Sequence, residues 1–189
     1  MALLIFGLIL FLGLHSLRIV ADGGRAAFIE RFGEMSYKGV YSVLSLIGIV
    51  LVSMGYKRAY GEYGLLYEPV AGLSHLALIL VPIAFVLVAA AYAPAGHIKQ
   101  AVKHPMVLGV ALWALGHLLA NGMVADVVFF GAFLAWALAD YASALSRPLP
   151  VKGAVSAKGD IAALAIGLIM AGLFIAFLHR YLFGVSPVG

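Results

Sequence analysis

Six long apolar runs, each close to the length of a membrane crossing, dominate the chain. About 20 apolar residues in a helix cross the hydrocarbon core of a bilayer. With 65% hydrophobic and 11% charged residues, the 189-residue chain has more apolar side chains than a soluble domain could bury. We therefore expect an all-α, polytopic membrane helical bundle of about six transmembrane helices, in one domain of residues 1–189. The runs cover residues 1–20, 39–56, 71–93, 103–122, 124–145 and 160–183.

Residues 21–38 differ from the runs on either side because charged and apolar residues are interleaved there. Arg25 and Arg31, for example, are interspersed with Phe28 and Phe32. A helix with one charged and one apolar face lies flat in the headgroup region of a membrane. The sequence thus predicts an amphipathic interfacial helix after the first span.

The basic residues predict the orientation of the chain. Nine of the twelve Lys and Arg residues lie in or beside the loops that follow the first, third and fifth spans. Loops rich in basic residues stay in the cytoplasm. We expect a bacterial inner-membrane protein with both termini in the periplasm. Basic residues placed this way set topology and contact lipid headgroups, so we expect no nucleic-acid partner.

Two of the runs repeat a small residue at every fourth position, which places the small residues on one helix face. Such stripes let membrane helices approach closely, and we interpret both as packing surfaces. Pro148 and Pro150 should end the fifth helix, since proline does not continue a helix. The stripes consist of Gly131, Ala135, Ala139 and Ser143 in the fifth run, and of Ala163, Gly167 and Ala171 in the sixth.

The fourth run carries polar groups that are rare in lipid-embedded helices. His104 stands at its start, and Trp113, His117 and Asn121 follow at intervals of four. Residues four apart share a helix face, so the pattern predicts one polar and aromatic stripe. An imidazole in lipid is costly without a partner, which makes His117 a functional candidate.

Asp140 is a polar group inside the fifth run. If the fourth and fifth helices form an antiparallel hairpin, Asp140 lies near the level of His104. We expect Asp140 to pair with His104, with Arg147 or with a nearby lysine. Alternatively, the Asp140 carboxylate has no partner in the protein and extends to the cytoplasmic surface.

The chain contains no cysteine, which excludes disulfides, thiolate metal sites, iron–sulfur clusters and covalently attached haem. Among its six histidines, His15 and His117 have apolar sequence on both sides. Two neutral imidazoles suit low-spin haem iron. His75 lies closer than His15 to the predicted depth of His117 and is the other candidate partner. The same imidazoles could instead hydrogen-bond across helices without any cofactor.

Segments of the first five runs together resemble the NnrU family of bacterial membrane proteins. The most specific part is the succession of KHP, LG, W and GHLLANG within residues 103–122. The resemblance links the chain to denitrification, where members of that family act on the expression or activity of nitrite and nitric oxide reductases. The other matching segments are HSLR at 15–18, MSYKGVYSVLSLIGIVLV at 35–52, SHLALIL at 74–80 and FLAWALADY at 133–141.

NnrU proteins are similar to 15-cis-zeta-carotene isomerase, which holds haem b between two histidines. Carried over by motif, those ligands are His15 and His117. The isomerase has a cysteine three residues before its second histidine, where this chain has Ala114, so a thiolate ligand switch is absent. The resemblance implies a bis-histidine haem b protein with a redox isomerase-like activity or an accessory role in nitrite and nitric oxide respiration.

The same resemblance suggests roles for neighbouring residues. Trp113 and Asn121 would contact the porphyrin, and Arg18 would meet a propionate. The implied partners are membrane lipids, a hydrophobic substrate such as a carotenoid, quinone or other prenyl lipid, and a respiratory-chain or nitric oxide partner.

Two other functions remain open. The KHPxxxG segment resembles the element with which isoprenylcysteine-type methyltransferases hold S-adenosylmethionine, and it would use His104. The acidic pair that those enzymes carry downstream is missing here. The other possibility is an assembly subunit without a cofactor, for which the small-residue stripes would serve as interfaces.

Overall fold

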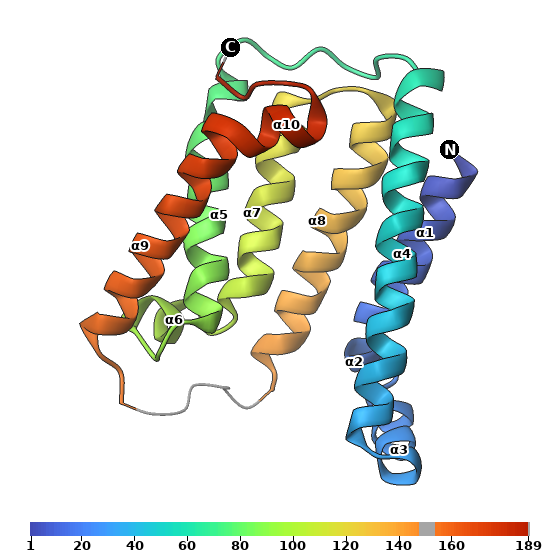
Figure 1. Ribbon diagram of the computed structural model, residues 1–189, viewed down its shortest axis with the longest axis vertical. Coiled ribbons are helices and arrows are strands. Elements are labelled where there is room, and N and C mark those ends of the chain that lie inside the picture. The colour runs from blue at the N-terminus through green and yellow to red at the C-terminus, as the bar shows by residue number, and fades with distance from the viewer. Residues whose placement is uncertain (148–153, 189) are drawn as a thin grey trace. The chain divides into compact units, whose positions relative to one another are not determined.

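The computed structural model describes residues 1–147 and 154–188, and within these ranges the chain is all α-helical, with one isolated β-bridge between Leu65 and Met123 and no strand. The predicted fold class is confirmed: the chain is an all-α membrane bundle (Figure 1). Pro148 and Pro150 lie outside the described residues. The helices are α1 (Ala2–His15), α2 (Leu17–Val20), α3 (Asp22–Phe32), α4 (Glu34–Glu62), η1 (Leu73–Leu76), α5 (Ala77–Tyr92), α6 (His97–Val102), α7 (Pro105–Ala120), α8 (Val124–Leu145), α9 (Ala157–Leu173), η2 (Phe174–Leu178) and α10 (His179–Phe183).

Each of the six apolar runs forms a helix, but the helices differ in length. Four segments within the described residues are long and apolar enough to cross a membrane: Glu34–Glu62, Leu73–Tyr92, Val124–Leu145 and Ala157–Phe183. The runs that give α1 and α7 form helices of 14 and 16 residues. At 1.5 Å per residue these two are about 21 and 24 Å long, less than the ~30 Å of the hydrocarbon core.

A separate helix, α3, lies within the segment for which the sequence predicts an interfacial helix, but it is shorter than that segment. Helix α3 ends at Phe32, and Gly33 follows with a φ of 84°, in the left-handed region that favours glycine. The next helix, α4, already begins at Glu34. Residues 34–38 therefore belong to the long membrane helix, because the glycine ends α3 earlier than the charge pattern indicates.

The chain forms two compact units, which are described one at a time. The first unit comprises residues 1–68 and 121–136, and the second comprises residues 69–120 and those from 137 to the C-terminus. The chain passes from one unit to the other after residues 68, 120 and 136, so α7 belongs to the second unit while α8 contributes to both.

In the first unit, α1 runs antiparallel along α4 (Figure 1). Their backbones approach so closely that a Cβ atom on Gly7 would lie 2.6 Å from the Val52 amide nitrogen. On the facing helix, a Cβ on Gly55 would lie 2.7 Å from the Leu3 carbonyl carbon. Glycines at such positions let membrane helices pack by direct backbone contact.

In the second unit, α5 packs against both α7 and α9 (Figure 1). The small-residue stripe of the sixth run is buried at Ala163, Gly167 and Ala171, and a Cβ on Gly167 would lie 2.7 Å from the Val86 amide nitrogen. This stripe is a packing surface, as predicted.

The corresponding prediction for the fifth run is wrong. Ala135 and Ala139 are exposed, and a Cβ on Gly131 would meet nothing within 4 Å. The buried side of α8 instead carries Ala125, Phe130, Phe133, Ala137 and Ala144. Burial of the two phenylalanines removes much apolar surface, and Ala135 and Ala139 lie off the side that carries them.

The close contact at Gly167 generates a stability prediction. Gly167→Ile would drive a branched side chain into the α5 backbone, and we expect an unfolding free energy lower by about 3 kcal/mol, near the upper end of overpacking effects. The matched control is Gly172→Ile in the same helix, where a Cβ meets nothing within 4 Å. Thermal unfolding in mild detergent compares the two variants. Equal midpoints would contradict the packing account.

Candidate functional site

His15 is the last residue of α1 and stands in a group of aromatic rings within the first unit. The centroid of its ring lies 4.2 Å from that of Phe11, 5.2 Å from that of Tyr41 and 5.9 Å from that of Trp136, which meets it edge-on at 89°. The indole Nε1 of Trp136 is buried and has no hydrogen-bond partner among the described residues. The His15 centre therefore contains a buried donor that lacks an acceptor.

The protonation of His15 follows from its backbone contact. Its Nδ1 lies 2.7 Å from the carbonyl oxygen of Phe11, one helical turn earlier. A carbonyl only accepts, so Nδ1 carries the proton and the lone pair of the neutral ring lies on Nε2. This is the tautomer in which a histidine binds a metal through Nε2, with Nδ1 held by a second partner.

His117 repeats this arrangement in the second unit. Its Nδ1 lies 2.8 Å from the carbonyl oxygen of Trp113, and the two rings are 5.2 Å apart. In both units an aromatic residue four positions before the histidine provides both the carbonyl and a ring contact. The predicted pairing of Trp113 with His117 on one face is confirmed.

Asn121 does not belong to this helical stripe. Helix α7 ends at Ala120, and Asn121 lies in the turn before α8, in the first unit. There its carbonyl oxygen accepts a hydrogen bond of 2.8 Å from the Tyr67 hydroxyl. Gly122, next in the turn, packs directly on the Tyr67 backbone, so the chain leaves the helix before the fourth-residue spacing can place Asn121 on its face.

Two of the remaining predicted site residues, Arg18 and His75, are exposed. Arg18 lies on α2, and His75 lies in the short 3₁₀ helix η1. His15 and His117 are both half-buried. The two histidines singled out by the motif are thus less exposed than the alternative ligand.

His104 lies at a strained turn between α6 and α7. Lys103 has φ 63° and ψ −52°, and the His104 amide donates to the Val102 carbonyl at 2.6 Å, which is the geometry of a classic γ-turn. The Tyr141 hydroxyl donates to the same carbonyl at 3.0 Å. The Nε2 atom of His104 is buried and lacks a hydrogen-bond partner within the described ranges.

Asp140 forms an ion pair with Arg147, at 3.0 Å between Oδ1 and Nη2. Of the partners predicted for Asp140, Arg147 is confirmed, whereas the structure has no hydrogen bond between Asp140 and His104. The guanidinium of Arg147 extends back from just beyond the end of α8, and its planar donor geometry suits a carboxylate. The two side chains are only 16 and 21% exposed.

Asp126 is a buried polar residue that the sequence analysis missed. It is 2% exposed, its Oδ1 accepts a hydrogen bond from the Tyr56 hydroxyl, and its Oδ2 accepts one of 3.1 Å from the Met123 amide. Burial raises the pKa of the nearby Tyr67 hydroxyl, and the negative charge of Asp126 raises it further. The sequence signal for Asp126 is its position in the first turn of a predicted helix. Carboxylates at such positions accept hydrogen bonds from the backbone amides that have no partner within the helix.

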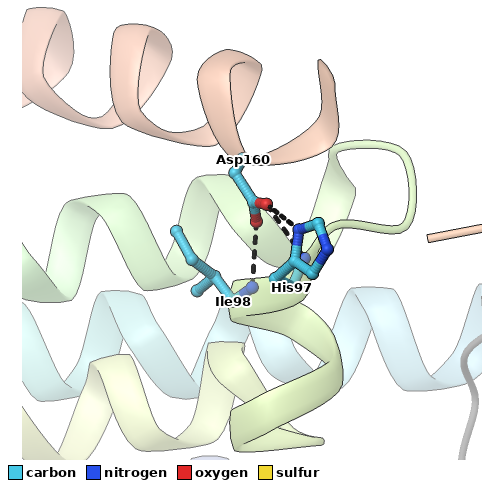
Figure 2. A network of polar contacts seen from close by, with 3 residues as sticks. All are labelled: His97, Ile98 and Asp160. Carbon is cyan, nitrogen blue, oxygen red and sulfur yellow. Dashed lines mark hydrogen bonds and ion pairs between the residues drawn. The ribbon is translucent and has the colours of Figure 1, made fainter. Parts of the chain in front are cut away.

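Asp160 is the second carboxylate that sequence reasoning missed. Figure 2 shows it bridging to the start of α6, where it accepts hydrogen bonds from the His97 amide at 3.0 Å and the Ile98 amide at 2.9 Å. Its Oδ2 also lies 2.7 Å from Nδ1 of His97. Asp160 in α9 therefore caps a helix 63 residues earlier in the chain and fixes α6 to α9.

The two histidine centres contain one ligand-type residue each. No group of three or more His, Cys, Asp or Glu side chains within the described residues forms a metal site.

Comparison with known proteins gives one match. The chain matches the sequence model of the family described as NnrU protein over residues 3–187. No curated protein and no solved structure matches it.

The hydrogen bond from the Tyr56 hydroxyl to Asp126 predicts that removing this hydroxyl lowers the stability of the protein. Tyr56→Phe leaves a buried carboxylate without one of its donors, and hydrogen bonds to charged groups contribute about 1.5–3 kcal/mol. We expect an unfolding free energy lower by about 2 kcal/mol. Tyr60→Phe is the control, since Tyr60 is 47% exposed on the same helix. Thermal unfolding of both variants tests this, and equal effects would refute it.

The γ-turn at Lys103 predicts a stabilising substitution. Glycine adopts a positive φ without the penalty that a Cβ atom brings, so Lys103→Gly should raise the unfolding free energy by about 1 kcal/mol, the lower end of typical backbone strain. Lys103→Ala removes the same side chain but keeps the Cβ, and should bring no such gain. If the alanine variant is as stable as the glycine variant, backbone strain is not the cause.

Proposed function

Since the chain belongs to the NnrU family, we propose that it is a membrane haem b protein with His15 and His117 as the axial ligands of the iron. The observation that carries the proposal is the shared arrangement of these histidines. Each donates from Nδ1 to the carbonyl four residues earlier, and each contacts the aromatic ring at that position. Such second partners fix the tautomer and orientation of metal-binding histidines.

The residues around His15 fit a haem group. The chain has no cysteine, so histidines are its natural strong ligands for haem iron. The buried Nε1 of Trp136 lacks an acceptor within the described residues, and an unsatisfied buried donor costs about 1–3 kcal/mol. The carboxylates of haem b are acceptors that can satisfy such a donor. Phe11 and Tyr41 supply the apolar and aromatic surroundings that a porphyrin requires.

When bound, haem b would supply one-electron redox chemistry. The role of the chain is to fix the orientation of the two imidazoles through the hydrogen bonds from their Nδ1 atoms. This supports a redox function in the membrane, either isomerase-like or accessory to nitrite and nitric oxide respiration. The distribution of the basic residues supports a place in the bacterial inner membrane with both termini in the periplasm.

A second candidate function rests on the turn at Lys103. Its strained backbone and the buried, unpartnered Nε2 of His104 are features that often mark functional positions. This turn belongs to the KHPxxxG segment, so S-adenosylmethionine binding at His104 is the alternative. The two functions depend on different histidines, which makes them separable by substitution.

The test is the visible absorption spectrum of the protein purified from haem-replete cells, oxidised and then reduced with dithionite. We expect a Soret band and sharp reduced α and β bands, as for six-coordinate haem b. His15→Ala and His117→Ala should each abolish this spectrum, whereas His75→Ala and His179→Ala should preserve it.

A protein that is colourless and takes up no added haemin would contradict the proposal. Binding of S-adenosylmethionine that is lost in His104→Ala would then favour the second candidate. A colourless protein that binds neither group would point to an assembly subunit without a cofactor.

A further inference from the structure

A cavity lies inside the first unit, between α1, α2, α3 and α4. Its volume is about 220 Å³, and it is open on one side. Apolar side chains make up most of its walls, among them Leu14, Phe28 and Leu44, and Arg25, Tyr37 and Tyr41 are its polar members. Helix α3 thus borders a hollow and does not pack fully against α4.

The size and lining of this cavity suit an apolar chain better than water. The exposed walls of this cavity are almost entirely apolar, and an ordered water molecule needs two to four polar partners. That space accommodates a segment of a hydrocarbon chain, and its open side allows the rest of the molecule to continue outward.

Arg25 gives the cavity one positive charge. Its Nε lies 3.2 Å from Oδ1 of Asp22, and its guanidinium lies 5.8 Å from the centroid of the Tyr37 ring. The Asp22 side chain is 60% exposed, so this ion pair is a weak surface contact. The guanidinium has five donors in a planar fork, and those that Asp22 does not use can bind the oxygens of a phosphate.

We propose that this cavity binds one acyl chain of an anionic phospholipid, with its phosphate held by Arg25. The apolar walls suit the acyl chain, and the guanidinium of Arg25 suits the phosphate of the headgroup. Arg18, exposed on the neighbouring α2, adds a second positive charge near the surface.

The bound lipid would border the His15 centre. Tyr41 lines the cavity, and its ring lies 5.2 Å from the His15 ring. The lipid therefore contacts a residue of that centre through Tyr41. The lipid site itself requires no haem and goes beyond the proposed function.

Two glycines of α3 provide a matched test of the cavity. A Cβ added to Gly24 or to Gly23 meets nothing within 4 Å, but Gly24 lines the cavity and Gly23 does not. Gly24→Phe should therefore fill the cavity, whereas Gly23→Phe has the same effect on helix propensity without filling it. Arg25→Gln removes the charge, and Arg25→Lys keeps it.

The experiment uses the full chain in phosphatidylcholine vesicles that contain phosphatidylglycerol with a photoactivatable group at the end of one acyl chain. Peptide mass spectrometry locates the label. We expect labelling within residues 14–44 that falls about fivefold in Gly24→Phe and in Arg25→Gln, and that persists in Gly23→Phe and Arg25→Lys. A diacylglycerol probe with the same chains but no phosphate should label wild type at the low level of Arg25→Gln.

Equal labelling of Gly24→Phe and Gly23→Phe would overturn the cavity as the binding site. Equal labelling of wild type by the two probes would overturn the phosphate contact and indicate a neutral lipid or prenyl chain. Helical circular dichroism of each variant verifies that it is folded, and the comparison of Arg25→Gln with Arg25→Lys keeps the proposal testable if Gly24→Phe does not fold. The haem spectrum is a separate readout, so failure of the lipid site and failure of haem binding are distinguishable.

Discussion

A polar group placed within a lipid bilayer must find a partner inside the protein, and the structure depends on this constraint. Backbone groups satisfy it by forming helices throughout the described ranges. The polar side chains meet the same requirement case by case. Asp126 accepts from Tyr56 and Met123, Asp160 caps α6, and His15 donates to a backbone carbonyl. A few buried polar atoms, such as Trp136 Nε1 and His104 Nε2, have no partner among the described residues and are exceptions to this rule.

The second constraint is close approach between helices, since lipid offers little hydrophobic gain from packing one apolar helix on another. Gly7 and Gly55 let α1 and α4 meet backbone to backbone, and Gly167 does the same for α9 on α5. The contact of Gly7 and Gly55 holds α1, which ends at the proposed ligand His15, and the contact of Gly167 lies in the unit that carries His117. Small residues without a facing helix, such as Gly131, do not contribute in this way.

Features set by local sequence could be predicted, whereas those set by contacts between distant residues could not. The apolar runs located every membrane helix, and the four-residue spacing placed Trp113 beside His117. The spacing failed at Asn121, because α7 ends one residue earlier and the turn is held by Tyr67. Asp126 and Asp160 were missed since their partners include residues 70 and 63 positions away. The periodicity of one helix does not reveal such distant partners.

The central claim is that His15 and His117 together bind one haem iron, and electron paramagnetic resonance of the ferric protein tests it most directly. Two imidazole ligands produce a low-spin ferric signal, which the account predicts for wild type. A wild-type signal that is purely high-spin, as for iron with one axial histidine, would contradict the pairing even if haem is bound. A low-spin signal unchanged in His117→Ala would equally contradict it, because the second ligand would then be another residue.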